Sequence, residues 1–323
     1  EAATVQAAGS LSTAAVLGDY RGQHVLSVKQ FDRHFLHQLF NLAHDLRVFT
    51  SRGPVDILKG MSMASIFYEP STRTSCSFTA AMQRLGGTVV SVQDQTTSSV
   101  AKGETLEDFI RVMERYADVV VLRHPEKGSV RRVSTKMKKP IINAGDGAGE
   151  HPTQALLDVY TIREEIGTVN GLTIALVGDL KNGRTVHSLA ELVTLYDVKL
   201  KLCAPKGLEM PQDIVDLVKA RGIKVTQHEV VDEVMADADV VYVTRLQKER
   251  FEEASQYQSL SSYTITPETL LRAKPNMILM HPLPRTGEIS EECDLDPRAV
   301  YFRQAEHGMY VRMALLVAVL GKA

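Results

Sequence analysis

Residues 63–93 read MASIFYEPSTRTSCSFTAAMQRLGGTVVSVQ and contain three structural segments in succession. The apolar run at 63–68 and the Val-rich run at 88–93 have the length and composition of strands, and residues 72–85 have the length of one helix. Short strands separated by a helix are typical of a βαβ unit, in which the two strands run parallel. The segment therefore predicts a parallel sheet that carries helices.

The same alternation continues on both sides of this segment. Upstream, Ser27 and Gln30 form a capping box in front of an amphipathic run from Phe31 to Leu46, which predicts one long helix. Downstream, helices are expected over 104–116, from 152, and over 184–195, 211–221, 231–236 and 311–320. Strands are expected over 118–122, 140–143, 173–177, 198–203, 224–228, 240–244 and 277–280. The predicted fold class is α/β, with two doubly wound parallel-sheet domains and helices on both faces of each sheet.

The length of 323 residues and the hydrophobic share of 44% also favour two domains over one. We expect the first domain over 21–151 and the second over 152–304. The closing helix has no strand of its own to follow in the second half, so residues 305–323 are expected to return to the first domain. Residues 1–20 are rich in Ala, Ser, Gly and Thr, which predicts a linker or a disordered segment.

Charge and hydropathy narrow the kinds of partner that the chain can have. The net charge is −2 and the pI is about 6.6, so no overall basic field is available to gather nucleic acid or an anionic membrane. No apolar run approaches the roughly eighteen residues of a membrane span, and the first residues lack the pattern of a signal peptide. Cys76, Cys203 and Cys293 are widely separated, which fits reduced thiols. These observations predict a cytoplasmic protein with small-molecule partners.

Ligands of open parallel sheets bind at the carboxyl ends of strands, so functional residues are sought in the loops that follow them. The loop after the first strand carries Glu69, Ser71, Thr72, Arg73 and Thr74 at the start of a helix. A helix N-terminus offers unpaired N–H groups and a favourable dipole, to which these hydroxyl and guanidinium groups add donors. The cluster predicts a phosphate site. Ordinary N-capping by Ser71 or Thr72 is the alternative, but it leaves Arg73 unexplained.

Two further loops of the first half carry Arg123 and, at a helix start, His151 and Gln154. Arg123 can pair with a phosphate or carbonyl oxygen, and His151 or Gln154 can hydrogen-bond a polarised carbonyl or an amide NH₂. Each is weak evidence alone, because a single histidine in an enzyme is often a satisfied structural group. No second His or Cys stands at ligand spacing, so no metal is expected.

The second half carries Arg184 after the segment GDLKNG and Arg245 at the end of another strand. Two guanidinium groups that project from strand-end loops suit a dicarboxylate, because each can grip one carboxylate in a bidentate fork. The alternative is that these arginines form salt bridges at the protein surface. A nicotinamide dehydrogenase would need the glycine pattern GxGxxG, and a P-loop would need its Gly-Lys-Ser/Thr ending; both are absent.

The segment HPLPR at 281–285 follows the last strand. Pro282 and Pro284 remove backbone donors and fix the turn, so the carbonyl groups around Leu283 can accept hydrogen bonds from a ligand amide. A plain rigid loop is the alternative.

These motifs, from about residue 21 to 323, occur in an order that resembles the aspartate and ornithine carbamoyltransferase family. STRTS at 71–75, SSVAKGE at 98–104 and HPLPR in place of a Cys-containing loop resemble the aspartate branch. The ornithine branch would need a site for a cationic side chain, which Arg184 with Arg245 does not favour. The linker-like start further resembles the C-terminal portion of a multifunctional eukaryotic pyrimidine-synthesis protein.

The resemblance implies transfer of the carbamoyl group of carbamoyl phosphate to the amino group of L-aspartate, with no cofactor. Carbamoyl phosphate would be bound by Ser71, Thr72, Arg73, Thr74, Arg123, His151 and Gln154, by Pro282 and Leu283, and by Ser98 and Lys102 of a neighbouring subunit. Aspartate would be bound by Lys102, Arg184, Arg245, Gln247 and Leu283. The catalytic residues would be Arg73, Thr74, Lys102, Arg123, His151 and Gln154.

The resemblance also implies how the site is assembled. Glu69 would pair with Arg184 or Arg250 across the cleft and so couple aspartate binding to domain closure. The chain would form a homotrimer with active sites shared between subunits, and pyrimidine-pathway domains would be covalently linked upstream of it. A non-enzymatic nucleic-acid module is the remaining alternative, on the basic stretch 127–139, but a solvated helix face fits the nearly neutral chain better.

Overall fold

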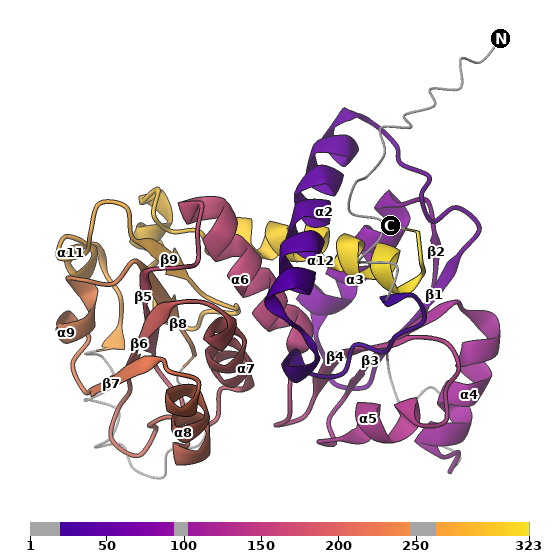
Figure 1. Ribbon diagram of the computed structural model, residues 1–323, viewed down its shortest axis with the longest axis horizontal. Coiled ribbons are helices and arrows are strands. Elements are labelled where there is room, and N and C mark those ends of the chain that lie inside the picture. Colours follow the sequence, from indigo (N-terminus) through magenta and orange to yellow (C-terminus); the bar gives the residue numbers. More distant parts are fainter. Residues whose placement is uncertain (1–19, 94–102, 246–262, 323) are drawn as a thin grey trace.

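The computed structural model describes residues 20–93, 103–245 and 263–322, which contain two parallel β-sheets (Figure 1). The first sheet has the strand order β2-β1-β3-β4 and the second has the order β7-β6-β5-β8-β9. The first comprises β1 (Ser62–Phe67), β2 (Thr88–Val92), β3 (Val119–His124) and β4 (Ile141–Asp146). The second comprises β5 (Leu172–Val177), β6 (Val198–Cys203), β7 (Lys224–His228), β8 (Val240–Val243) and β9 (Ile278–Met280).

Helices cover both faces of each sheet, as the sequence predicts. The helices around the first sheet are α2 (Arg33–Arg52), α3 (Thr72–Arg84), α4 (Leu106–Tyr116), α5 (Ser129–Ser134), α6 (Pro152–Ile166) and α12 (Tyr301–Val319). Those around the second are α7 (Arg184–Leu192), α8 (Gln212–Ala220), α9 (Asp232–Met235) and α11 (Pro267–Leu270). Three short 3₁₀ helices complete this part of the chain: η2 (Val28–Gln30), η4 (Val193–Leu195) and η7 (Glu291–Leu295).

Alternate residues of the central strands pack on opposite faces of the sheet. In β3, Val119 and Val121 belong to the core cluster that contains α2, α3 and α12, whereas Val120 and Leu122 belong to the cluster that contains α4 and α5. This period of two arises because successive side chains of a strand point to opposite faces. Both faces are therefore buried, which accounts for the continuous apolar runs of the strands in the sequence.

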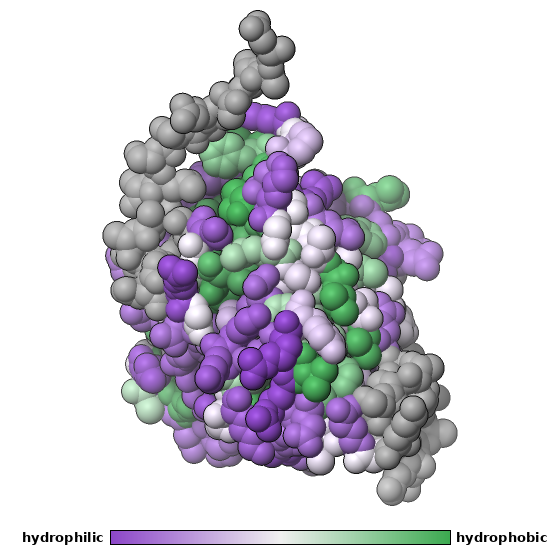
Figure 2. Space-filling model, turned by 90° about the vertical axis from the view of Figure 1, so that its right-hand side faces the viewer, coloured by the Kyte–Doolittle hydropathy of each residue, from purple (hydrophilic) through white to green (hydrophobic). Residues whose placement is uncertain are grey.

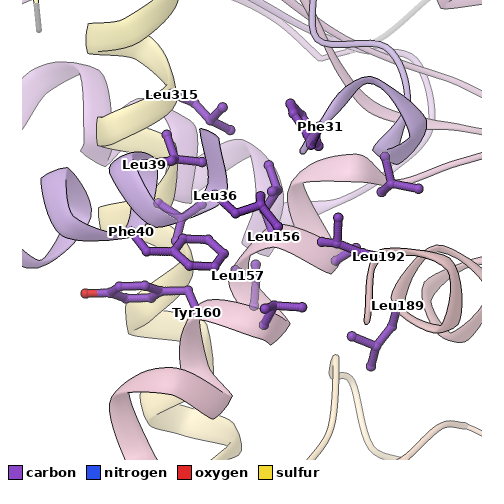
Figure 3. Packing of buried hydrophobic residues seen from close by; sticks show 14 of the residues in the cluster. Phe31, Leu36, Leu39, Phe40, Leu156, Leu157, Tyr160, Leu189, Leu192 and Leu315 are labelled. Atoms are coloured by element: carbon purple, nitrogen blue, oxygen red, sulfur yellow. The ribbon is translucent and has the colours of Figure 1, made fainter. Parts of the chain in front are cut away.

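The helices α6 and α12 join the two sheets. The helix α12 packs against α2, α3 and α6, and α6 also packs against α7 of the second sheet (Figure 1). Figure 3 shows Phe40 of α2 beside Tyr160 of α6, whose ring centroids are 5.6 Å apart. The same cluster of buried residues includes Leu189 and Leu192 of α7. The last helix therefore returns to the helices of the first sheet, and one apolar core continues from there to the second sheet.

Most predicted helices lie within three residues of their expected bounds, but α11 was not predicted, and α2 and α12 begin elsewhere than expected. The capping box of Ser27 and Gln30 is present, but it caps only η2; the long helix α2 begins after Asp32, whose Oδ1 accepts a hydrogen bond from Phe35 N at 2.7 Å. The final helix begins at Tyr301, ten residues before the apolar run that predicted it. Its first half contains polar residues that are nevertheless buried, among them Gln304 and His307.

The basic stretch between 127 and 139 forms α5 and its flanking turns. Arg132 bonds Glu107 at 2.8 Å and Glu126 at 2.5 Å on the solvent-exposed side of this helix. Acidic partners thus neutralise part of the stretch, as expected for a solvated helix face. No helix in the described ranges is long and apolar enough to cross a membrane.

Candidate active site

A cleft of about 940 Å³ lies where loops from the carboxyl ends of the two sheets face each other. Its walls come from the segments that follow β1, β3, β4, β5, β8 and β9, together with the starts of α3, α6 and α7. The described residues of the predicted site that line it are Glu69, Ser71, Thr72, Arg73, Thr74, Arg123, His151, Gln154, Arg184, Arg245, Pro282 and Leu283. Ser98, Lys102, Gln247 and Arg250 lie outside the described residues.

The phosphate site predicted after the first strand lies at the N-terminus of α3. Ser71 is the N-cap of this helix, but its hydroxyl makes no capping hydrogen bond. Ser71 lines the cleft at the N-terminus of the helix, and ordinary capping does not explain its hydroxyl group. Arg73 is exposed, and Thr74 is buried one residue further along. This arrangement offers an anion several neutral donors and one positive charge.

Glu69 joins arginines from the two sides of the cleft. Its Oε1 lies 2.5 Å from Arg123 Nη2 and 3.0 Å from Arg184 Nη2. Arg184 also donates to the carbonyl oxygen of Gly147, and Arg123 donates to that of Ala144 at 3.3 Å. Burial raises the pKa of Glu69, but the hydrogen bonds and charges of Arg184 and Arg123 outweigh this effect, and the pKa lies below its ordinary value. Glu69 is therefore an anion that neutralises part of a strongly cationic cleft.

His151 is the N-cap of α6 and is only 4% exposed. Burial, together with the charges of Arg123, Arg184 and Arg312, holds its pKa well below the ordinary value, so the imidazole is neutral near pH 7. Among the residues that the structure describes, none hydrogen-bonds its Nδ1 atom. The ring nevertheless lines the cleft, which places it beside a ligand bound there.

The other predicted residues complete the cleft. Arg245 follows β8, next to the buried Thr244. Leu283 has a φ of 53°, and its N–H donates to His281 Nδ1 at 2.7 Å. In the described part of the chain no hydrogen bond ends on the carbonyl oxygen of Pro282 or Leu283. The prediction that these carbonyl groups accept hydrogen bonds from a ligand amide is compatible with this geometry. The same part of the chain holds no group of three or more metal-ligating side chains.

Three buried residues beside the cleft were not predicted. Arg312 is 3% exposed, and burial lowers its pKa to about 10. Its Nη1 atom lies 2.9 Å from Ser77 Oγ of α3, and its Nη2 atom lies 3.4 Å from Thr153 Oγ1 at the start of α6. The sequence signal that could have identified Arg312 is that it is the single charged residue inside the apolar run 311–320. Asp158 and Gln304 are 0% and 1% exposed and bond to each other at 2.7 Å. Neither belongs to a recognisable motif.

Comparison with protein-family models identifies both halves of the chain. Residues 23–164 match the carbamoyl-P binding domain of aspartate/ornithine carbamoyltransferase, and residues 170–319 match its Asp/Orn binding domain. The solved structure of aspartate transcarbamoylase from Trypanosoma cruzi in complex with N-(phosphonacetyl)-L-aspartic acid is 45% identical, with a TM-score of 0.89, and the match covers 94% of this chain and 97% of that one. The chain therefore belongs to the aspartate/ornithine carbamoyltransferase family, and the predicted family and fold are confirmed.

Two further relatives bear on the choice of acceptor and on the longer context. The same Trypanosoma cruzi enzyme in complex with carbamoyl phosphate and aspartate has a TM-score of 0.90 and is 43% identical over 97% of this chain and 100% of that one. The multifunctional protein pyr1-3 of Dictyostelium discoideum is 56% identical over 97% of this chain. This chain spans 14% of the length of that relative.

Proposed function

We propose that the chain transfers the carbamoyl group of carbamoyl phosphate to the amino group of L-aspartate, giving N-carbamoyl-L-aspartate and phosphate in de novo pyrimidine synthesis. One observation carries the proposal: the cleft brings Arg73 and Arg123 from the first sheet to face Arg184 and Arg245 from the second. Two sets of guanidinium groups suit one phosphate and one dicarboxylate. The solved relative that is bound to carbamoyl phosphate and aspartate supports this assignment.

Carbamoyl phosphate would bind at the start of α3. The hydroxyl groups of Ser71, Thr72 and Thr74 and the guanidinium of Arg73 would hold its phosphate, together with the helix N-terminus. Arg123, Thr74 and His151 would hydrogen-bond the carbamoyl oxygen and stabilise the charge that develops there. Gln154 and the carbonyl groups of Pro282 and Leu283 would accept hydrogen bonds from the carbamoyl NH₂.

Aspartate would bind against the second sheet. Arg184 and Arg245, joined by Gln247, would hold its two carboxylates, and Leu283 would line the site beside them. The domain that binds carbamoyl phosphate would span 21–151 and 305–323, and the domain that binds aspartate would span 152–304. Packing of α12 against α2 and α3 supports the return of the chain end to the first domain.

The reaction needs positioning and charge stabilisation more than acid or base groups of the protein. Carbamoyl phosphate already carries a good leaving group, and the cleft would hold the amine of aspartate against the carbamoyl carbon. The amine attacks in its neutral form, the C–O bond to phosphate breaks, and the departing phosphate accepts the proton that the amine loses. Neutral His151 fits this scheme as a hydrogen-bond partner of the carbamoyl oxygen, because its depressed pKa disfavours the protonated form.

Glu69 would control closure of the cleft. Its carboxylate bonds Arg123 and Arg184, the same arginines that the proposal assigns to the substrates. Substrate oxygen atoms would take over part of these bonds, and Glu69 would then pair with Arg184 or with Arg250 across the closed cleft. Occupying the aspartate site would in this way change the contacts between the two domains.

The enzyme would act as a cytoplasmic homotrimer in which Ser98 and Lys102 enter the site of a neighbouring subunit. These two residues lie in the segment that directly follows the edge strand β2. Exposed apolar side chains lie on β2 and α4, including Val90, Val112 and Tyr116. Figure 2 shows the face of the molecule on this side, where hydrophobic residues are interspersed among hydrophilic ones. Covalent linkage to other pyrimidine-pathway domains is supported by the multifunctional relative.

A test of the proposal uses N-(phosphonacetyl)-L-aspartic acid, the compound bound in the solved relative. If one cleft holds both substrates, calorimetry should show one molecule bound per chain, with binding weakened by either carbamoyl phosphate or aspartate. Binding that aspartate does not weaken would contradict the assignment of Arg184 and Arg245.

A further inference from the structure

A buried carboxylate, that of Asp158, lies behind the cleft at the centre of α6. It is 0% exposed and receives hydrogen bonds from three side chains. Its Oδ1 accepts from Gln154 Nε2 at 2.9 Å and from Gln304 Nε2 at 2.7 Å, and its Oδ2 accepts from the Tyr242 hydroxyl at 2.9 Å. The donors come from α6, α12 and β8, so the contact joins three elements that are distant in the chain.

The three donors favour the ionised form of Asp158. A carboxylate only accepts hydrogen bonds, whereas a carboxylic acid would have to donate one proton. Burial raises the pKa of Asp158, the hydrogen bonds from Gln304, Tyr242 and Gln154 oppose the rise, and the pKa lies at about 7, so the carboxylate is ionised above that pH. The ionised carboxylate can bond only the NH₂ end of an amide, which fixes which way each glutamine points.

This constraint determines what Gln154 presents to the cleft. Its amide nitrogen is directed to Asp158, so the oxygen Oε1 is the end that remains for a ligand. An amide oxygen accepts hydrogen bonds from an NH₂ group and repels a carbonyl oxygen. The orientation therefore suits the carbamoyl NH₂ and excludes the opposite placement of the carbamoyl group.

The same carboxylate also holds the HPLPR turn. Gln304 donates to Asp158 and accepts, through Oε1, a hydrogen bond from His281 N at 2.9 Å. His281 in turn fixes the turn from both ring nitrogens: Nδ1 accepts from Leu283 N at 2.7 Å, and Nε2 lies 2.7 Å from Glu288 Oε1. Asp158 is thus connected to Gln154 and to the carbonyl groups of Pro282 and Leu283.

We propose that Asp158 is a positioning residue that directs Gln154 Oε1 and the HPLPR carbonyl groups onto the carbamoyl NH₂. The site thereby selects the carbamoyl group over groups of the same shape that lack N–H donors. The proposal rests on the function proposed above, because it assumes that carbamoyl phosphate binds in this cleft. It assigns a role to a residue that does not itself line the cleft.

Acetyl phosphate is the probe that isolates this role, because a methyl group replaces the NH₂ while the phosphate and carbonyl stay the same. We would measure dissociation constants of carbamoyl phosphate, acetyl phosphate and inorganic phosphate for the full chain and for Asp158→Leu. We expect Asp158→Leu to lower the preference for carbamoyl over acetyl phosphate at least about tenfold, with phosphate binding changed less than about threefold. An unchanged preference in the folded variant would overturn the proposal.

Matched variants separate positioning from a loss of structure. In Asp158→Asn, Oδ1 can still accept hydrogen bonds from both glutamines, and Nδ2 can donate one to the Tyr242 hydroxyl. This variant should therefore keep the preference for carbamoyl over acetyl phosphate. Tyr242→Phe leaves both glutamine bonds intact and should also keep it. If Asp158→Leu does not fold, Asp158→Ser leaves room for water beside the glutamines and should show the same lost preference.

A further variant separates this proposal from the proposed function. Gln154→Met removes the amide oxygen itself and should lower the preference as much as Asp158→Leu does. If Gln154→Met leaves the preference intact, the carbamoyl NH₂ does not bind at Gln154 and the proposed site is wrong. If Gln154→Met lowers the preference and Asp158→Leu does not, only the role of Asp158 is wrong.

Discussion

The carboxylate of Glu69 and the guanidinium of Arg184 lie 3.0 Å apart, although 115 positions separate them in the chain. The first follows a strand of the first sheet, and the second begins a helix of the second sheet. Their bond is a direct electrostatic link across the cleft, and it is only partly exposed to solvent. Such a link is worth more than a surface ion pair, because solvent screens it less.

Replacing Glu69 by Gln should raise the KM for aspartate about tenfold, because a neutral amide holds Arg184 across the cleft less strongly than a carboxylate does. Affinity for carbamoyl phosphate should change much less. Steady-state kinetics with each substrate varied in turn measures both effects. The matched control is Glu107→Gln, which makes the same change in the pair with Arg132, away from the cleft. Equal KM values for aspartate in wild type and Glu69→Gln would show that the link does not contribute to closure.

Replacing His151 by Ala should lower kcat roughly a hundredfold, the usual effect of removing one hydrogen-bond donor to a developing oxyanion. An obligatory general base would leave almost no turnover when removed. His34→Ala, on the exposed side of α2, is a control for the loss of an imidazole. Turnover of His151→Ala below about one part in a million of wild type would favour the general-base role instead.

His151 should also make the protein less stable in mild acid. Its folded-state pKa is depressed by burial and by Arg123, Arg184 and Arg312, so the unfolded chain binds a proton near pH 6.5 that the folded chain does not bind. The free energy of unfolding should therefore fall as pH falls below about 6.5, by up to about 1.4 kcal/mol per pH unit from this residue. Urea unfolding at pH 7.5 and 5.5 should show a smaller acid loss for His151→Asn than for wild type. The same loss in both proteins would mean that His151 titrates normally when folded.

Shared active sites predict complementation between two inactive variants. Lys102→Ala and Arg73→Ala remove residues that the proposal places in one site but on different subunits. Mixed oligomers should therefore contain some sites with both residues intact and recover part of the wild-type activity. Sedimentation analysis would confirm the mixing of subunits. Confirmed mixing without recovered activity would indicate that each chain builds its whole site alone.

Much of the fold followed from local sequence patterns. Apolar runs identified central strands such as β5 and β8, because a strand buried on both faces has no polar face to obscure the pattern. The bounds of β6 and β7 were also predicted, although these two strands carry polar residues and are partly exposed. The start of the last helix was missed because Gln304 and His307 are polar yet buried. Each is buried against a hydrogen-bond partner that lies 146 residues away in the chain. The break between η2 and α2 was missed because two capping residues, Ser27 and Asp32, follow each other closely.

The loops of the cleft were also predictable, because ligands of parallel sheets bind at the strand ends. The pairing of Glu69 with Arg184 was expected from the family resemblance, whereas its bond to Arg123 was not. Asp158 could not be found, since its importance comes from Gln304 and Tyr242, which are remote in the chain. A buried carboxylate becomes recognisable only when its donors are in place.

We expect the facing arginine sets to bind carbamoyl phosphate and aspartate side by side in one cleft. The most direct measurement is product formation by the purified chain from carbamoyl phosphate with aspartate and, in parallel, with ornithine. We expect N-carbamoyl-L-aspartate from the first mixture and no citrulline from the second. Citrulline as the main product would contradict the assignment of Arg184 and Arg245 to a dicarboxylate.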